Sequence, residues 1–280
     1  MTGVVGRYGK WILQGPALQE RNPPTPDESV KMRLFCVPQA GCGAWVYHGW
    51  THKLPPDIEV MPLELPGRNS RMMEPKQHSM KDLVNDVVEA ILPLLREKPY
   101  ALLGHSMGAW LVYEVAKALQ ARGEPPPLKL YVVANRPPHL YGATNDPDQI
   151  APTLGNLPAA EFWTHLERRY GKNPDLQHEG IRKFIFPVLQ ADFALLETYQ
   201  PSDPSFTPLS CPVAACGAEG DNRYSKSQLA EWSKHTSSNF EEHWFEGNPA
   251  PDYWGTSHRF IIDHPGPFQA FLSEDLPKLF

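Results

Sequence analysis

The chain has 280 residues, of which 41% are apolar, 21% charged and 11% aromatic, a composition typical of globular proteins and unlike that of disordered chains. Its formal net charge of −6 provides no positive field for a polyanion, so we expect no nucleic-acid partner. No apolar run is long enough to cross a membrane and the first residues lack the apolar segment of a secretory signal, so we expect a cytoplasmic protein without membrane contact.

In its first half, the chain alternates short apolar runs with amphipathic stretches. Short runs that end at Pro, Gly or a cluster of small residues are typical of buried strands, and apolar side chains three and four residues apart are typical of helices. The predicted strands cover residues 32–37, 58–65, 100–103 and 128–134, and the predicted helices cover residues 83–95 and 107–122. Strands that alternate with helices predict an α/β fold, a parallel sheet with helices on both faces.

The alternation stops between residues 136 and 200. This segment contains two predicted helices, at residues 159–170 and 180–199, in loops rich in Pro, Gly and Asp, and no predicted strand. The pattern then resumes with strands at residues 211–216 and 239–245 and helices at residues 225–235 and 265–279. We therefore expect one α/β core formed by residues 1–135 and 201–280, with residues 136–200 inserted as a helical cap.

Residues 104–108, Gly-His-Ser-Met-Gly, fit the pattern Gly-x-Ser-x-Gly between a predicted strand and a predicted helix. In this setting the serine occupies a sharp strand-to-helix turn, and the glycines leave room for the backbone to fold closely. Ser106 is therefore the candidate nucleophile. The alternative interpretation is a glycine-rich packing turn without chemistry.

A serine becomes a good nucleophile only when a base takes its proton, and after this motif an acid and a histidine are expected in that order along the chain. Asp221 follows a late predicted strand and is our candidate acid, with Glu219 as the alternative. His258 follows the last predicted strand and is our candidate base. His243 lies within that strand and His264 adjoins the last predicted helix, which favours structural roles for both.

An acyl-transfer site also needs two backbone N–H groups for the oxyanion, one from the residue after the nucleophile and one from the loop after an early strand. Met107 supplies the first by its position, and Ala40 is the expected second, because it lies in a run of small residues. Cys42 in the same run is an alternative thiol nucleophile, but no histidine motif accompanies it. The four cysteines lack the spacing of zinc sites, and we interpret them as buried free thiols.

Several stretches resemble the type II thioesterases of polyketide and nonribosomal peptide synthesis, which share the α/β-hydrolase fold with medium-chain fatty acyl thioesterases. They are FCVPQAG at residues 35–41, LPGR at 65–68, GHSMGA at 104–109, and PVLQADF at 187–193 with ETY at 197–199. The likeness extends from about Trp11 to the C-terminus. The stretch at 187–193 is the most specific, since other hydrolases of this fold have no reason to carry it.

The resemblance implies an α/β-hydrolase core with an inserted lid. It further implies hydrolysis of acyl thioesters on the phosphopantetheine arm of an acyl or peptidyl carrier protein, through an acyl-enzyme intermediate, without a metal or another cofactor. The chain contains no Asp-Ser-Leu attachment motif for phosphopantetheine, so the carrier would be another protein or domain. We expect Gln39 and Phe193 to contact the substrate.

Other interpretations stay open at this point. A carboxylesterase or lipase would use the same serine, acid and histidine without needing the cap stretch. A non-catalytic relative that binds a carrier or a small ligand would usually lack one of the three, whereas candidates for all three are present. The cap either packs on the core alone, or its apolar side chains, including Phe193, line an acyl pocket over Ser106.

Overall fold

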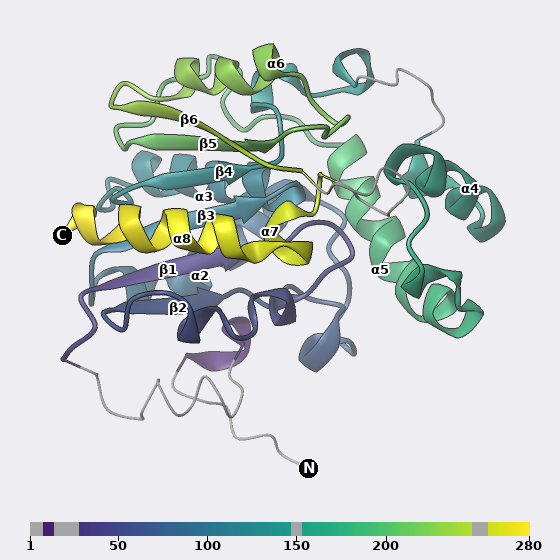
Figure 1. The fold of residues 1–280 in the computed structure, drawn as a ribbon, viewed down its shortest axis with the longest axis horizontal. Coiled ribbons are helices and arrows are strands. Elements are labelled where there is room, and N and C mark those ends of the chain that lie inside the picture. The colour runs from purple at the N-terminus through teal and green to yellow at the C-terminus, as the bar shows by residue number, and fades with distance from the viewer. Residues whose placement is uncertain (1–7, 14–27, 147–152, 248–256) are drawn as a thin grey trace.

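A six-stranded sheet forms the centre of the protein, whose computed structural model describes residues 8–13, 28–146, 153–247 and 257–280 (Figure 1). The strand order is β2-β1-β3-β4-β5-β6, and each neighbouring pair is parallel. The strands are β1 (Met32–Val37), β2 (Ile58–Pro62), β3 (Tyr100–His105), β4 (Leu130–Val133), β5 (Val213–Ala218) and β6 (Phe240–Phe245). All carboxyl ends therefore lie along one edge of the sheet.

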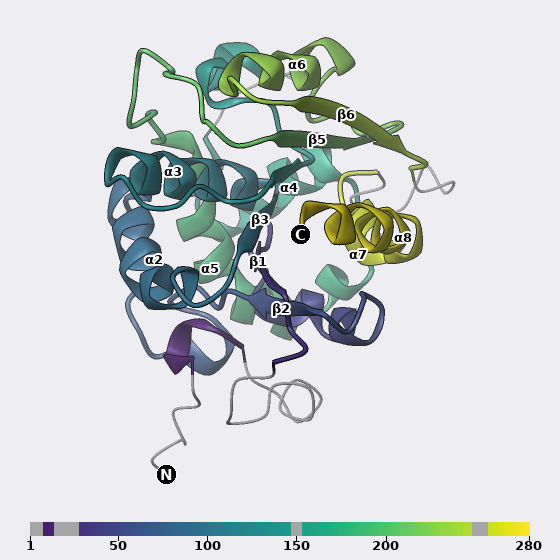
Figure 2. The same cartoon turned by 90° about the vertical axis from the view of Figure 1, so that its left-hand side faces the viewer.

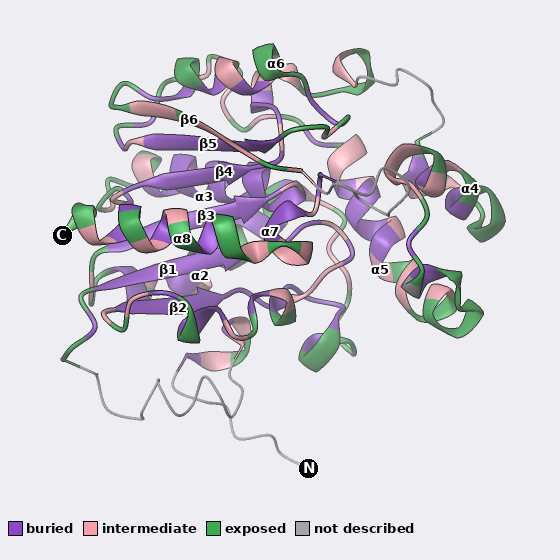
Figure 3. Ribbon diagram, in the orientation of Figure 1, coloured by how far each residue is buried: buried purple, intermediate pink, exposed green. Residues whose placement is uncertain are grey.

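Helices cover both faces of this sheet, which confirms the predicted fold class. α2 (Met80–Leu95) and α3 (Met107–Ala121) lie on one face and α8 (Pro265–Asp275) on the other (Figure 2). The other α-helices of the described residues are α4 (Ala159–Tyr170), α5 (Glu179–Glu197), α6 (Lys226–Ala230) and α7 (Phe260–Asp263). Strands covered on both faces are buried along their whole length, as β1 to β5 are, whereas the edge strand β6 is only partly buried (Figure 3).

The ends of the helices follow from local sequence. Ser79 caps α2 by accepting a hydrogen bond from the Asp82 N–H, and the apolar side chains of α2 face the core. Gly123 ends α3 with a φ of 70°, a left-handed conformation that suits glycine. No helix in the described part of the chain is long and apolar enough to span a bilayer.

Most predicted elements are present, with shifts at their ends. β1 and α4 have the predicted bounds. β2 ends at Pro62 instead of residue 65, because the chain after Leu63 turns away from β1 and the Glu64 N–H donates to the Trp11 carbonyl at 2.8 Å. The predicted helix at residues 265–279 is α8 followed by a 3-10 turn, Leu276–Leu279, since Pro277 cannot continue an α-helix. The predicted helix at residues 225–235 is likewise α6 followed by a 3-10 turn, Glu231–His235.

The segment between β4 and β5 contributes helices and, among its described residues, no strand. In Figure 1, α4 and α5 lie beyond the carboxyl ends of the strands. Their apolar side chains, with those of the 3-10 turns that precede each helix, form a cluster separate from the main core; its buried members are Leu154, Phe162, Trp163, Leu166, Leu176, Leu189 and Phe193. This cluster therefore faces the edge of the sheet where the predicted catalytic residues lie.

Candidate active site

Ser106 occupies a sharp turn between β3 and α3. Its backbone has φ 55° and ψ −114°, a strained conformation for a residue other than glycine, and its N–H donates to the Val133 carbonyl at 2.8 Å. The flanking glycines are required by close packing: a Cβ on Gly104 would lie 2.0 Å from the Gly108 carbonyl oxygen, and one on Gly108 would lie 2.3 Å from the Val37 carbonyl oxygen. The turn thus raises the Ser106 side chain above the carboxyl edge of the sheet.

Three segments bring Ser106, His258 and Asp221 into one hydrogen-bonded chain. His258 Nε2 lies 2.9 Å from Ser106 Oγ, and His258 Nδ1 lies 2.8 Å from Asp221 Oδ2. The Asp221 side chain is fully buried, and its other oxygen accepts the Arg223 N–H at 2.9 Å. Glu219 instead pairs with Lys226 at 2.6 Å, with 56% of its side chain exposed. The loop after β5 therefore places Asp221, and not Glu219, against the histidine.

The other histidines considered from the sequence lie elsewhere. His243 is on β6, 3.2 Å from Glu241, and His264 is the N-terminal cap residue of α8. His258 follows residues 248–256, which lie outside the described residues. Within the described ranges, no group of three or more His, Cys, Asp or Glu side chains could hold a metal ion.

His105 supports this arrangement, although its place in the sequence pattern indicated no role. Its Nε2 lies 2.7 Å from the His258 carbonyl oxygen, and its Nδ1 lies 2.8 Å from the Gln39 side-chain amide. Burial lowers the pKa of His105 to about 3, so its imidazole is neutral at physiological pH. His105 thereby links the backbone of His258 to Gln39. A polar residue inside a buried strand is the signal for such a link, because buried polar groups need partners.

The loop after β1 lies beside Ser106. Within the described residues, neither the Ala40 N–H nor the Met107 N–H donates a hydrogen bond, which leaves both available to an oxyanion. Cys36, Cys211 and Cys216 are buried as predicted, but Cys42 is only partly buried, since it lines the pocket at Ser106. Desolvation raises the pKa of Cys42, which favours the thiol over the nucleophilic thiolate.

The pocket around Ser106 has two branches. They share Ser106, His258, Tyr170, Phe193 and Leu196. The apolar branch continues along the loop after β1 and is lined by Leu166, Leu176, Ile185 and Leu189. The polar branch is lined by Arg136, Asp146, Arg169, Glu197 and Arg223. Phe193 and Gln39, the two residues expected to contact substrate, both line the apolar branch, and Phe193 also lines the polar one.

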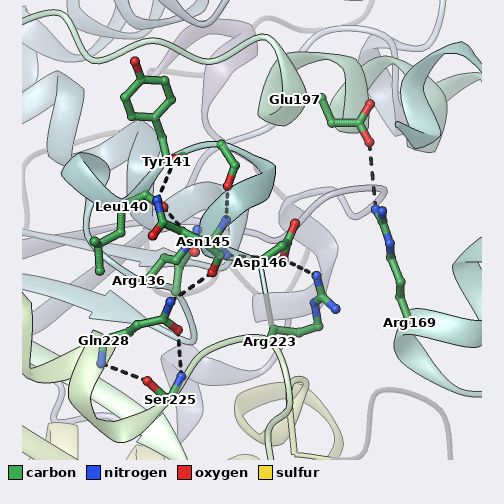
Figure 4. A network of polar contacts seen from close by, with 12 residues as sticks. Arg136, Leu140, Tyr141, Asn145, Asp146, Arg169, Glu197, Arg223, Ser225 and Gln228 are labelled. Carbon is green, nitrogen blue, oxygen red and sulfur yellow. Dashed lines mark hydrogen bonds and ion pairs between the residues drawn. The ribbon is translucent and has the colours of Figure 1, made fainter. Parts of the chain in front are cut away.

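Ion pairs hold the charged side chains of the polar branch in place (Figure 4). Asp146 pairs with Arg223 and lies 3.5 Å from Arg136 Nη1. Glu197 lies 3.9 Å from Arg169 and accepts the N–H groups of Leu154 and Gly155. Burial raises the pKa of Glu197. The branch therefore presents fixed hydrogen-bonding groups to whatever occupies it.

Comparisons with known proteins show the family to which this chain is similar. The family model "Thioesterase domain" matches residues 32–251. Thioesterase PikA5 of Streptomyces venezuelae is 31% identical, covering 91% of this chain and 85% of the relative. The solved RedJ thioesterase from the prodiginine pathway of Streptomyces coelicolor is 29% identical, with a TM-score of 0.75 over 91% of this chain and 98% of that one.

Another relative, the linear gramicidin dehydrogenase LgrE of Brevibacillus parabrevis, is 33% identical over 85% of both chains. Its name describes a different reaction, but the matching family model covers most of the present chain and is a thioesterase domain. The resemblance to type II thioesterases and the α/β-hydrolase fold are thereby confirmed.

Proposed function

Because the chain belongs to the thioesterase family and is a thioester hydrolase, we propose that it removes acyl groups from the phosphopantetheine arm of a carrier protein, with Ser106, His258 and Asp221 as its catalytic residues. One observation carries the proposal: the Ser106–His258–Asp221 chain lies where the two branches of the pocket meet. Relatives from gramicidin and prodiginine synthesis support a carrier of a peptide or polyketide synthase as the partner.

The geometry supports a two-step mechanism. His258 takes the Ser106 proton while Oγ attacks the thioester carbonyl, and Asp221 orients the imidazole and stabilises its charged form. The oxyanion faces the N–H groups of Ala40 and Met107. Collapse of the intermediate breaks the C–S bond, and His258 returns the proton to the pantetheine sulfur. Water, activated by His258, then hydrolyses the acyl-enzyme and restores Ser106.

The apolar branch of the pocket suits the acyl chain of such a substrate, and the polar branch suits its pantetheine arm. Burial of an acyl chain is favourable by ~0.8 kcal/mol per methylene, which requires the apolar lining formed by Leu166, Leu176, Ile185 and Leu189. The pantetheine arm contains amides, which are costly to bury without hydrogen-bond partners, and the polar branch supplies those partners. Phe193 lines both branches and in this proposal contacts the substrate near the thioester, as does Gln39 in the apolar branch.

Residues 136–200 serve in this proposal as a lid over a core formed by residues 1–135 and 201–280. The separate apolar cluster of α4 and α5, and the pocket lining that both helices supply, support this division. Lids of this kind exclude water and select the substrate.

The test compares acyl carrier proteins loaded with chains of two to twelve carbons against p-nitrophenyl esters of the same acids. Mass spectrometry of the carrier should show loss of the acyl group with the wild-type enzyme and not with Ser106→Ala. Higher kcat/KM on the esters than on the carriers would favour a carboxylesterase. Binding of acyl carrier without turnover of either substrate would favour a non-catalytic relative.

A further inference from the structure

Two of the stretches that resemble the type II thioesterases meet in space through a buried ion pair. Arg68 Nη2 lies 2.7 Å from Asp192 Oδ1, and Arg68 Nη1 lies 2.8 Å from Asp192 Oδ2, so the pairing is bidentate. Arg68 follows β2, whereas Asp192 belongs to α5. Both side chains are less than a tenth exposed. The ion pair thus ties α5 to the core next to the active site.

The same pair holds the loop that carries Ala40. Asp192 Oδ2 accepts the Gly41 N–H at 2.8 Å, and Arg68 Nη1 donates to the Cys42 carbonyl at 2.9 Å. Gly41 has a φ of 76°, and a Cβ there would lie 2.3 Å from a methyl group of Leu189 on α5. The loop after β1 is therefore pressed against α5 at Gly41, the residue that directly follows Ala40.

From these contacts we propose that Asp192 is a positioning residue that sets the Ala40 N–H for the oxyanion. By fixing the Gly41 N–H, its carboxylate fixes the peptide plane that joins Ala40 to Gly41 and so limits the orientation of the preceding peptide. Because Asp192 lies on α5, the oxyanion site is complete only while α5 is packed on the core. The inference rests on the proposed function, since it assigns this purpose to the Ala40 N–H.

The first experiment replaces the whole pair by apolar side chains, in the double variant Arg68→Met/Asp192→Leu. Exchange of a buried ion pair for apolar residues is often neutral for stability, so the fold should persist while the hydrogen bond to Gly41 is lost. We expect kcat to fall about 10²–10³-fold, the usual effect of losing one oxyanion donor, with KM nearly unchanged.

The matched control is Arg33→Met/Glu59→Leu. Arg33 Nε lies 2.6 Å from Glu59 Oε2 in an equally buried pair, which joins the amino ends of β1 and β2 at the opposite edge of the sheet. This variant should keep the wild-type kcat. A purely structural role for Arg68 and Asp192 predicts the same outcome for both double variants.

Ligand-binding measurements distinguish a positioning role of the Arg68–Asp192 pair from a role in folding alone. An alkyl boronic acid forms a tetrahedral adduct with a serine and needs the oxyanion site, whereas an S-alkyl pantetheine thioether does not. Calorimetric titration should show loss of boronate affinity in Arg68→Met/Asp192→Leu by the same factor as kcat, with thioether affinity retained. Wild-type boronate and thioether affinities in that variant would overturn the inference.

Single variants keep the test decisive if the double variant does not fold. Asp192→Asn retains an oxygen that accepts the Gly41 N–H, whereas Asp192→Ala does not, and both leave Arg68 without its ion pair. Asn should therefore retain far more kcat and boronate affinity than Ala, and equal losses would overturn the inference. If the wild type bound the boronate but did not hydrolyse acyl thioesters, the proposed function would be wrong. The boronate affinities of Asp192→Asn and Asp192→Ala would still test the inference.

Discussion

The sheet core and the helices between β4 and β5 are held in different ways. Strands β1 to β5 are buried along their whole length in one large cluster, and short turns at their carboxyl ends fix Ser106 and Asp221 by backbone hydrogen bonds. The helices α4 and α5 have a much smaller cluster of their own. α5 also leaves large apolar side chains in solvent, with Phe184 65% exposed.

This difference in packing indicates that the core and the helices α4 and α5 have different roles. A dense core can hold reacting groups at fixed distances, which catalysis requires, while a smaller layer with its own packing can change shape with the substrate. Substitutions at the core site should therefore stop the chemistry, and substitutions in α4 and α5 should change which acyl groups are accepted.

Removal of the nucleophile should have the largest effect. Ser106→Ala should lower kcat by about 10⁶-fold, since the acyl-enzyme of the proposed mechanism forms on Ser106 Oγ. The melting temperature should hardly change, because alanine at this position keeps the same backbone strain. A fluorophosphonate should label Ser106 of the wild type in mass spectrometry, and labelling of another residue would contradict the assignment.

Removal of the acid that orients His258 should have the second largest effect. Asp221→Asn should lower kcat by about 10⁴-fold, because the imidazole loses the partner that selects its tautomer. Glu219→Gln is the matched control on the same loop, and it should change kcat little, since Glu219 faces solvent and Lys226. If only the glutamine variant were inactive, the acid would be Glu219.

Lowering the pH should destabilise the folded protein, because its buried histidines are neutral. Burial lowers the pKa of His105 and of His235 to about 3, so the unfolded chain binds protons at a higher pH than the folded one. This contribution to stability is complete above pH ~6.5 and is lost as the pH falls toward 3, by up to about 1.4 kcal/mol per pH unit for each histidine.

Urea unfolding between pH 7 and pH 4 measures that slope. His235→Gln should reduce the slope by the equivalent of up to one bound proton, because the buried neutral imidazole is then absent from the folded state. Equal slopes in the wild type and in His235→Gln would show that His235 is not a buried neutral group.

The smallest effect should be a change in acyl preference. Phe193→Ala should enlarge the pocket and favour longer acyl groups, by ~0.8 kcal/mol or about fourfold in kcat/KM for each methylene newly buried. Phe162→Ala is the matched control, since the two rings lie 5.9 Å apart in one cluster but Phe162 does not line the pocket. Both variants should melt lower, and an unaltered chain-length profile in Phe193→Ala would leave Phe193 a packing role only.

Local sequence was enough to predict most of the fold and the order of the candidate residues. Apolar runs and helical spacing depend on neighbours a few residues away, so the first and last residues of β1 and α4 could be predicted correctly. The Gly-x-Ser-x-Gly pattern likewise describes one turn, and the steric limits at Gly104 and Gly108 act within that turn and on the adjacent strand.

Contacts between segments that are distant in sequence decided which charged side chains are buried and how they are paired. Asp221 and Glu219 are two residues apart and chemically alike, and only the tertiary fold buries one against His258 and turns the other to solvent. The Arg68–Asp192 pair spans 124 residues of sequence, so no local pattern reveals that α5 holds the loop of Ala40. Local patterns specify which elements form, whereas the burial and pairing of each charge depend on what the completed fold places beside it.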